Sequence, residues 1–119
     1  MKNIVIIGGS KGIGRAIVKH LVTSHKVVNI SRTVPDFVHD NLSHFSLDVL
    51  QDDLPPIDAV DTLIYCPGSI NLQPINRLKL EDFKNDFNIN VLGAVKTIQT
   101  YLPQLKEGAN PSILLFSTV

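Results

Sequence analysis

Three glycines lie close together near the amino end of the chain, at Gly8, Gly12 and Gly14. They follow an apolar run at residues 3–8 and precede a segment with helical periodicity, so the order is strand, tight turn and helix. Glycine lets the backbone turn sharply and lets a phosphate approach without a Cβ in the way. The unpaired N–H groups at a helix start attract anions. The turn therefore indicates phosphate binding, and a turn without any ligand is the weaker explanation.

The spacing of these glycines narrows the chemistry. The pattern GxxxGxG is neither the common dinucleotide pattern GxGxxG nor a P-loop, which ends in GK followed by Ser or Thr. Lys11 precedes its glycine instead of following one. The sequence therefore gives little support to phosphoryl transfer.

The elements that must position this turn alternate along the chain. Short β-rich runs are expected at residues 3–8, 26–31, 44–49, 60–66 and 112–118, with helices at 12–24 and 81–105. Strands alternating with helices predict an α/β fold, a doubly wound parallel sheet of the Rossmann type with about five strands. Residues 31–42 and 50–59 are expected to be loops.

Both predicted helices carry apolar residues at steps of three or four, which indicates a buried face. In the first helix these positions are Ile13, Ile17, Val18 and Leu21. In the long helix they are Phe83, Phe87, Val91, Val95, Ile98 and Leu102.

Composition excludes several classes of protein. The 119 residues include 11 basic and 11 acidic side chains, so the basic patch of a nucleic-acid-binding protein is not expected. The sequence contains no run of about 18 apolar residues, so no membrane span is expected. The single cysteine, Cys66, excludes an internal disulfide and a cysteine-rich zinc site. We expect a soluble, cytoplasmic domain.

The stretch IIGGSKGIGRAI resembles the first strand-to-helix turn of the short-chain dehydrogenases/reductases, whose pattern is TGxxxGxG, with Ile7 in place of the threonine. The resemblance implies an incomplete dinucleotide-binding domain of that family over residues 1–119. It also implies that the turn holds the cofactor, through Gly8, Ser10, Lys11, Gly12, Ile13 and Gly14.

Two later segments are similar to the family in the same order. In SLDV, Asp48 and Val49 match the family's Asp-Val pair, whose aspartate meets the adenine; an ordinary strand-end aspartate is the alternative. Where the family has NNAG, this chain has YCPG, so only Gly68 matches and the local packing is in question. Cys66 is expected to be a small buried residue and not a nucleophile.

Two residues are implied to take part in catalysis. NINVLGAV resembles the family's N-x-x-G, in which the asparagine bends the helix and supports a proton relay; Asn90 takes that place, unless it is simply a polar residue in an amphipathic helix. Thr118 aligns with the catalytic serine, whereas a shift of one residue would select Ser117. The family's YxxxK is absent, so we expect no turnover by this chain alone.

The resemblance thus implies the cofactor-binding half of an oxidoreductase that transfers hydride between a nicotinamide and a carbonyl or alcohol. The alternative is a non-catalytic nucleotide-binding or protein-interaction module on the same fold. An NAD site places a carboxylate at the end of the second strand, where this chain has Ser31 followed by Arg32. Arg32 and Lys11 could bind a 2′-phosphate, which favours NADP(H) over NAD(H), although both could be solvated surface charges. Asp36, beyond Pro35, is discounted.

A homo-oligomer is also expected. In the family the long central helix commonly forms the dimer contact, and here it carries more apolar surface than one sheet face needs. The strand at 112–119 would leave an apolar edge uncovered.

Overall fold

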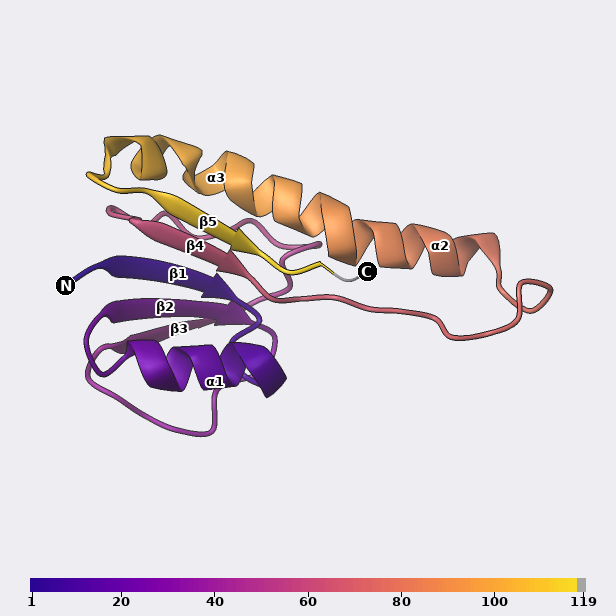
Figure 1. The fold of residues 1–119 in the computed structure, drawn as a ribbon, viewed down its shortest axis with the longest axis horizontal. Coiled ribbons are helices and arrows are strands. Elements are labelled where there is room, and N and C mark those ends of the chain that lie inside the picture. The colour runs from indigo at the N-terminus through magenta and orange to yellow at the C-terminus, as the bar shows by residue number, and fades with distance from the viewer. Residues whose placement is uncertain (118–119) are drawn as a thin grey trace.

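Five parallel strands form one sheet in the order β3-β2-β1-β4-β5 (Figure 1). The structure is a computed structural model and describes residues 1–117. The strands are β1 (Asn3–Ile7), β2 (Lys26–Ser31), β3 (Leu42–Ser46), β4 (Thr62–Tyr65) and β5 (Ser112–Leu115). The chain leaves β1 in one direction to build β2 and β3 and returns to its other side for β4 and β5. The predicted doubly wound α/β fold is confirmed.

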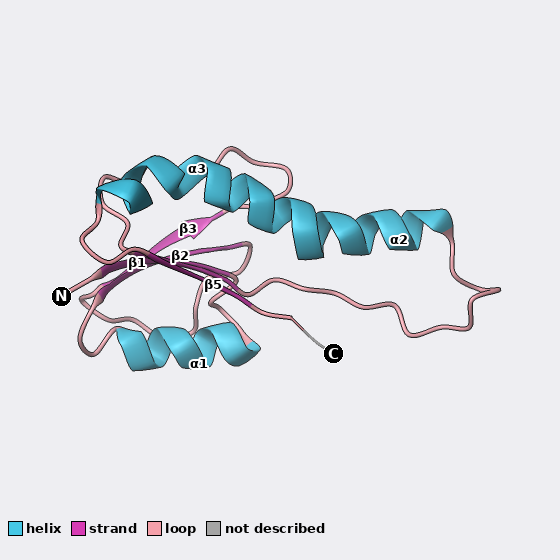
Figure 2. Cartoon of the chain, turned by 45° about the horizontal axis from the view of Figure 1, so that its top comes forward, coloured by secondary structure: helices cyan, strands magenta, loops and turns pink. Residues whose placement is uncertain are grey.

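The helices cover both faces of the sheet (Figure 2). Helix α1 (Gly12–Leu21) lies on one face and α3 (Gly93–Glu107) on the other. Helix α2 (Leu80–Phe87) and the π-helical segment η1 (Asn88–Leu92) precede α3, and α2 projects beyond the sheet (Figure 1). Among the described residues, no helix combines the length and the apolar character needed to span a bilayer.

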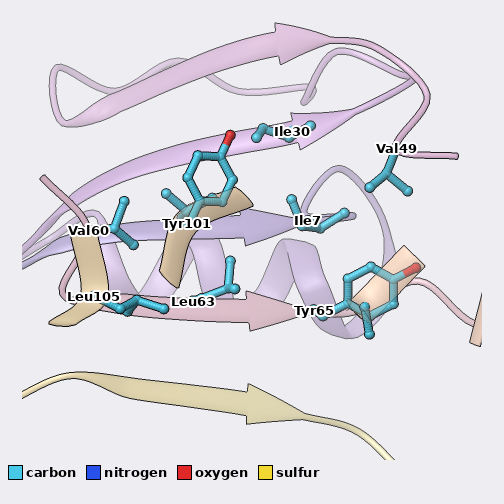
Figure 3. Close-up of a cluster of buried hydrophobic side chains, with 10 residues drawn as sticks. Ile7, Ile30, Val49, Val60, Leu63, Tyr65, Tyr101 and Leu105 are labelled. Carbon is cyan, nitrogen blue, oxygen red and sulfur yellow. The ribbon is translucent and has the colours of Figure 1, made fainter. Parts of the chain in front are cut away.

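The core consists of two apolar clusters separated by the sheet. Along β1, Val5 and Ile7 belong to the cluster beneath α3, and Ile4 and Ile6 to the cluster beneath α1. Figure 3 shows the α3 cluster, in which Tyr101 lies over the strands. Because helices cover both faces, the central strand is apolar at nearly every position instead of alternating.

Several predicted boundaries are wrong by a few residues. The third strand is Leu42–Ser46 and not 44–49, because the chain turns at Asp48, whose Oδ1 accepts the Leu50 N–H at 2.9 Å. The fourth strand is Thr62–Tyr65 instead of 60–66, and the fifth ends at Leu115 instead of 118. The first helix ends at Leu21 instead of 24.

The predicted buried faces of the helices are also partly wrong. Ile13 is 66% exposed, whereas the predicted Val18 is buried and Ile17 and Leu21 pack against the same cluster. The long helix buries a second stripe, made of Ala94, Thr97, Tyr101 and Leu105, and leaves Phe83, Phe87, Val91 and Val95 about half exposed. Both stripes have helical spacing, so periodicity alone could not choose between them. At its amino end the buried stripe has the small side chains of Ala94 and Thr97, and Gly93 beside them lies against Tyr65 of β4.

The long helix is interrupted where the sequence predicts one continuous element. In η1 the Gly93 N–H donates to the carbonyl of Asn88, five residues earlier, in place of the usual four. The interruption contains Asn90.

Candidate functional site

The glycine turn joins β1 to α1 in a conformation that requires glycine at two positions. Gly8 and Gly12 have φ of +80° and +56°, in the left-handed region that other residues rarely adopt. A Cβ on Gly14 would overlap the carbonyl oxygen of Gly8, so the helix can start this close to the turn only with glycine there. The Gly8 N–H donates to the Ile30 carbonyl at 2.9 Å, which ties the turn to β2.

The start of α1 is free to meet an anion. Within the described residues no side chain caps its first turn, and that turn contains no acidic residue. Lys11, at the N-cap, is extended and exposed. A Cβ added to Gly12 would meet nothing within 4 Å, so the space beside the turn is open. Unpaired N–H groups, the helix dipole and a lysine therefore favour negative charge at this point.

A pocket of about 490 Å³ opens at the carboxyl ends of β1 and β2. Five segments that are distant in sequence line it: the glycine turn, the end of β2, the turn after β3, the loop after β4, and residues 85–89 of α2 and η1. It brings together seven of the predicted residues, namely Gly8, Ser10, Lys11, Ser31, Arg32, Asp48 and Val49. Since the sheet order reverses between β1 and β4, the pocket lies where doubly wound sheets bind their ligands.

The other predicted residues lie elsewhere. Ile13 and Gly14 border a second hollow of about 230 Å³, together with Cys66 and Phe116. Neither hollow is lined by Gly12 or Gly68. Thr118 lies outside the described residues.

Two cations line the pocket, one in the glycine turn and one directly after β2, and among the described residues the one acid in its wall is Asp48, after β3. Arg32 and Lys11 border it, and within residues 1–117 neither forms an ion pair. Asp36 is instead held by Arg15 of α1, with Nε and Oδ1 2.7 Å apart. This hydrogen bond lowers the pKa of Asp36. The nearest acid after β2 is therefore paired on the outside of α1 and does not line the pocket.

Asp48 has a structural task as well as its place in the pocket wall. Besides accepting the Leu50 N–H through its side chain, it donates its own N–H to Asp52 Oδ2 at 2.7 Å. One carboxylate oxygen of Asp48 is therefore engaged in a hydrogen bond within the turn at residues 48–52.

The segment Tyr65–Cys66–Pro67 packs tightly, despite its departure from the family pattern. The Tyr65 hydroxyl donates to the Ile89 carbonyl in η1, and a Cβ on Gly93 would overlap that hydroxyl (Figure 3 shows the buried Tyr65). Burial, with the charge of Asp48, raises the pKa of Tyr65 to about 12. Burial also raises the pKa of Cys66 to about 11, which makes the thiol a poor nucleophile. The ring of Pro67 lies against Gly8.

Asn90 clamps η1 to the loop that follows β4. Its side chain accepts the Ser69 N–H at 2.8 Å and donates to the Ser69 carbonyl at 2.9 Å. Asp86 supports the same loop by accepting from the Ser69 hydroxyl at 2.6 Å and from Asn71 at 3.0 Å. These two hydrogen bonds lower the pKa of Asp86. Asn90 does not line the pocket, but Ser69, which it holds, does.

Sequence reasoning missed several polar residues of the pocket wall: Thr33, Gln51, Ser69, Asn85 and Asn88. Thr33 could have been found from its place directly after Arg32. No local signal marks Asn85 or Asn88, because they reach the pocket only through the tertiary packing of the helical rod, which is the continuous run of α2, η1 and α3.

The chain matches the short chain dehydrogenase family over residues 2–119. No curated protein sequence matches it. Among solved structures, it is similar to a short-chain dehydrogenase from Streptomyces avermitilis, at 25% identity and a TM-score of 0.87, over 99% of this chain and 50% of that one. A short chain dehydrogenase from Leptospira borgpetersenii with bound NAD+ aligns at 21% identity and a TM-score of 0.83, over 98% and 51% of the two chains.

The closed form of a serine dehydrogenase complexed with NADP+ aligns at 23% identity and a TM-score of 0.80, over 93% of this chain and 52% of that one. The chain therefore spans about half the length of the structures that it resembles.

Proposed function

Because the chain belongs to the short-chain dehydrogenase family, we propose that it binds NADP(H) in the pocket at the carboxyl ends of β1 and β2. One observation carries the choice of cofactor: Arg32 and Lys11 border the same pocket, and Ser31 stands where an NAD site has a carboxylate. The glycine turn and the uncapped start of α1 suit the pyrophosphate. The residues present therefore fit this cofactor.

Arg32 and Lys11 divide the recognition of the 2′-phosphate. The guanidinium of Arg32 offers a planar pair of donors to phosphate oxygens, and the ammonium of Lys11 adds a point charge. Pairing of Asp36 with Arg15 supports this assignment, because it leaves no acid at the end of β2 to repel the phosphate.

Titration of the chain with NADPH and with NADH tests the proposal. NADPH is expected to bind more tightly than NADH. Arg32→Ala should reduce the difference between the two binding free energies, because a charge-assisted contact contributes about 1.5–3 kcal/mol. Arg77→Ala is the matched control, since Arg77 is exposed and does not line the pocket. Equal affinity of the unchanged chain for both cofactors would refute the choice of NADP(H).

The reaction that we propose for the whole protein is that of the family. Bound NADP(H) supplies hydride exchange with a carbonyl or alcohol substrate. Asn90, through its clamp on Ser69, holds the pocket wall formed by the loop after β4. This chain, about half the length of the matched structures, supplies the cofactor-binding part.

A second candidate function is nucleotide binding without turnover. It is favoured by the two tyrosines, because the hydroxyl of Tyr65 donates to Ile89 and that of Tyr101 donates to the Pro55 carbonyl at 2.8 Å. Burial raises the pKa of both hydroxyls to about 12, so neither suits a proton donor to substrate. We expect the chain to bind NADPH without oxidising it in the presence of small aldehydes and ketones. Carbonyl-dependent loss of NADPH absorbance would instead assign catalysis to these 119 residues.

We also propose that the chain forms a homo-oligomer. The outer stripe of the helical rod supports this, because Phe83 and Phe87 are 49% and 53% exposed beside Val91 and Val95. An exposed apolar stripe of this kind is typical of a protein contact. Light scattering over a concentration series is expected to show an assembly that Phe87→Glu dissociates. Lys84→Glu, a charge change on the same helix, serves as the control, and a monomer at every concentration would exclude self-association.

A further inference from the structure

A buried asparagine in β2 joins the glycine turn to the segment that carries Arg32. Asn29 is fully buried, and it is one of two buried polar side chains among the described residues, the other being Thr97. Its neighbours in the strand, Val27 and Ile30, are apolar core residues. Burying a polar side chain in such a place lowers stability unless the side chain is hydrogen-bonded. The hydrogen bonds of Asn29 therefore show which segments it connects.

The side chain of Asn29 has one acceptor bond and two donor bonds. Its Oδ1 accepts the backbone N–H of Gly9, in the glycine turn, at 2.8 Å. Its Nδ2 donates to the Ser31 hydroxyl at 3.0 Å. The Ser31 hydroxyl donates in turn to the Thr33 carbonyl at 2.7 Å. A continuous chain of hydrogen bonds therefore runs from the turn beneath the pocket to the residues on both sides of Arg32.

The second proton of Nδ2 fixes the orientation of the amide. It points to Nδ1 of His44, on the neighbouring strand β3, at 3.0 Å. His44 Nδ1 must therefore accept, which leaves Nε2 to donate to the Ser46 hydroxyl at 2.7 Å. Because the Gly9 N–H and both Nδ2 protons have partners, the amide cannot rotate without breaking three bonds.

The fit around Asn29 leaves no room for a larger neighbour. A Cβ built on Gly9 would lie 2.6 Å from Asn29 Oδ1 and 2.6 Å from Val18. The asparagine thus meets the turn at its backbone, and any shift of the amide moves the turn relative to β2.

We propose that Asn29 is a positioning residue of the cofactor site, which sets the place of Arg32 relative to the glycine turn and so the preference for a 2′-phosphate. The inference rests on the proposed binding of NADP(H). Asn29 does not line the pocket and acts only through Gly9, Ser31 and Thr33.

Asn29→Leu tests this role, because leucine has nearly the same shape and none of the bonds. The ratio of NADH to NADPH dissociation constants is expected to fall by about tenfold, the effect of losing one charge-assisted contact. Thr97→Val is the matched control: it removes the other buried side-chain bond, from Thr97 to the Gly93 carbonyl, away from the pocket. It should lower the stability and leave the ratio unchanged. If Asn29→Leu does not fold, Asn29→Ala takes its place.

An unchanged ratio in the Asn29 variant would overturn the inference, and so would an equal fall in the Thr97 variant. A second readout needs no cofactor. In Asn29→Leu the Gly9 amide should exchange faster with deuterium, and the amide resonances of Arg32 and Thr33 should shift. If the unchanged chain binds neither cofactor, the proposed function fails, and these amide measurements then decide the positioning role alone. Unaltered exchange and resonances would overturn it.

Discussion

The two edge strands of the sheet differ in what they present to solvent. β3 carries Ser43, His44 and Ser46, and its polar side chains are hydrogen-bonded to one another or open to water. β5 carries Ile113, Leu114 and Leu115, which are 42%, 45% and 51% exposed. Polar edges resist pairing with other chains, whereas long apolar edges promote it. β3 therefore has the composition of an edge, and β5 that of an interior strand.

A comparison of β5 with β1 makes the same point from the other side. Both strands are nearly all apolar, yet Ile4, Val5, Ile6 and Ile7 are at most 4% exposed. β1 has a strand on each side and a helix on each face, whereas β5 pairs only with β4 among the described residues. The number of covering elements, and not side-chain hydrophobicity, separates the two strands.

Removing equivalent side chains from the inner and outer strands should give the largest effect. Ile6 pairs with Ile64, and Ile64 with Leu114, so Ile6 and Leu114 lie in one row of the sheet. Ile6→Ala is expected to lower the free energy of unfolding by about 2–5 kcal/mol. Leu114→Ala should lower it by only about 1 kcal/mol, because Leu114 is half exposed already. Urea unfolding measures both, and equal losses would mean that Leu114 is covered in solution.

Substitution by alanine should destabilise the chain more at Gly14, beside the inner strand β1, than at Gly108, which precedes the outer strand β5. Gly14→Ala places a Cβ against the Gly8 carbonyl, and the backbone shift it forces is expected to cost about 1–3 kcal/mol and to weaken NADPH binding. Gly108→Ala, between α3 and β5, is the control, with φ of −74° and a Cβ 3.2 Å from Asp61 Oδ1. It should change stability by about 0.5 kcal/mol or less. Thermal unfolding and cofactor titration measure the pair, and similar losses would contradict the contrast.

A charge placed on each edge tests which one associates. Leu114→Lys is expected to weaken self-association by about tenfold or more, since burial of one leucine contributes about 1.5–3 kcal/mol. Ser43→Lys on β3 should have no effect, because that edge is already polar. Sedimentation equilibrium of the three proteins measures the change. Equal association of all three would mean that β5 takes no part in self-association and would leave the outer stripe of the helical rod as the contact.

The smallest effect is expected from His44 on the polar edge. Burial lowers the pKa of His44 below its usual value of 6.5, so the folded chain binds fewer protons than the unfolded chain just below that pH. The contribution to stability is complete above pH 6.5 and decreases as the pH falls toward the folded pKa. His44→Gln should make the free energy of unfolding depend less on pH. The other histidines are present in both proteins, so the difference between the two curves reports on His44. Unfolding curves from about pH 7.5 to about pH 5 measure it, and parallel curves would exclude the effect.

Much of the fold could be predicted from local pattern, but less of the packing. The alternation of strands and helices predicted the parallel sheet, and the glycine spacing located the turn beside the pocket. The buried stripe of α3 could not be predicted, because Ala94, Thr97 and Tyr101 follow one another at steps of three or four, as Phe87, Val91 and Val95 also do. The end of β3 was predicted too late in the chain, because the Asp48 side chain accepts the Leu50 N–H and so favours a turn over a longer strand. Strand propensity does not describe this local hydrogen bond.

The sequence by itself determined the features that depend on the backbone of a few consecutive residues. Glycine at positions 8 and 12 permits the positive φ of the turn, because a residue without a Cβ adopts the left-handed region without strain. Only the tertiary structure decided which side chains act together. Asn29 bonds to Gly9, twenty residues away, and the Tyr65 hydroxyl fits beside Gly93 only because β4 and η1 pack together. Burial and hydrogen bonding of a side chain depend on neighbours brought from distant segments, and no local pattern specifies those neighbours.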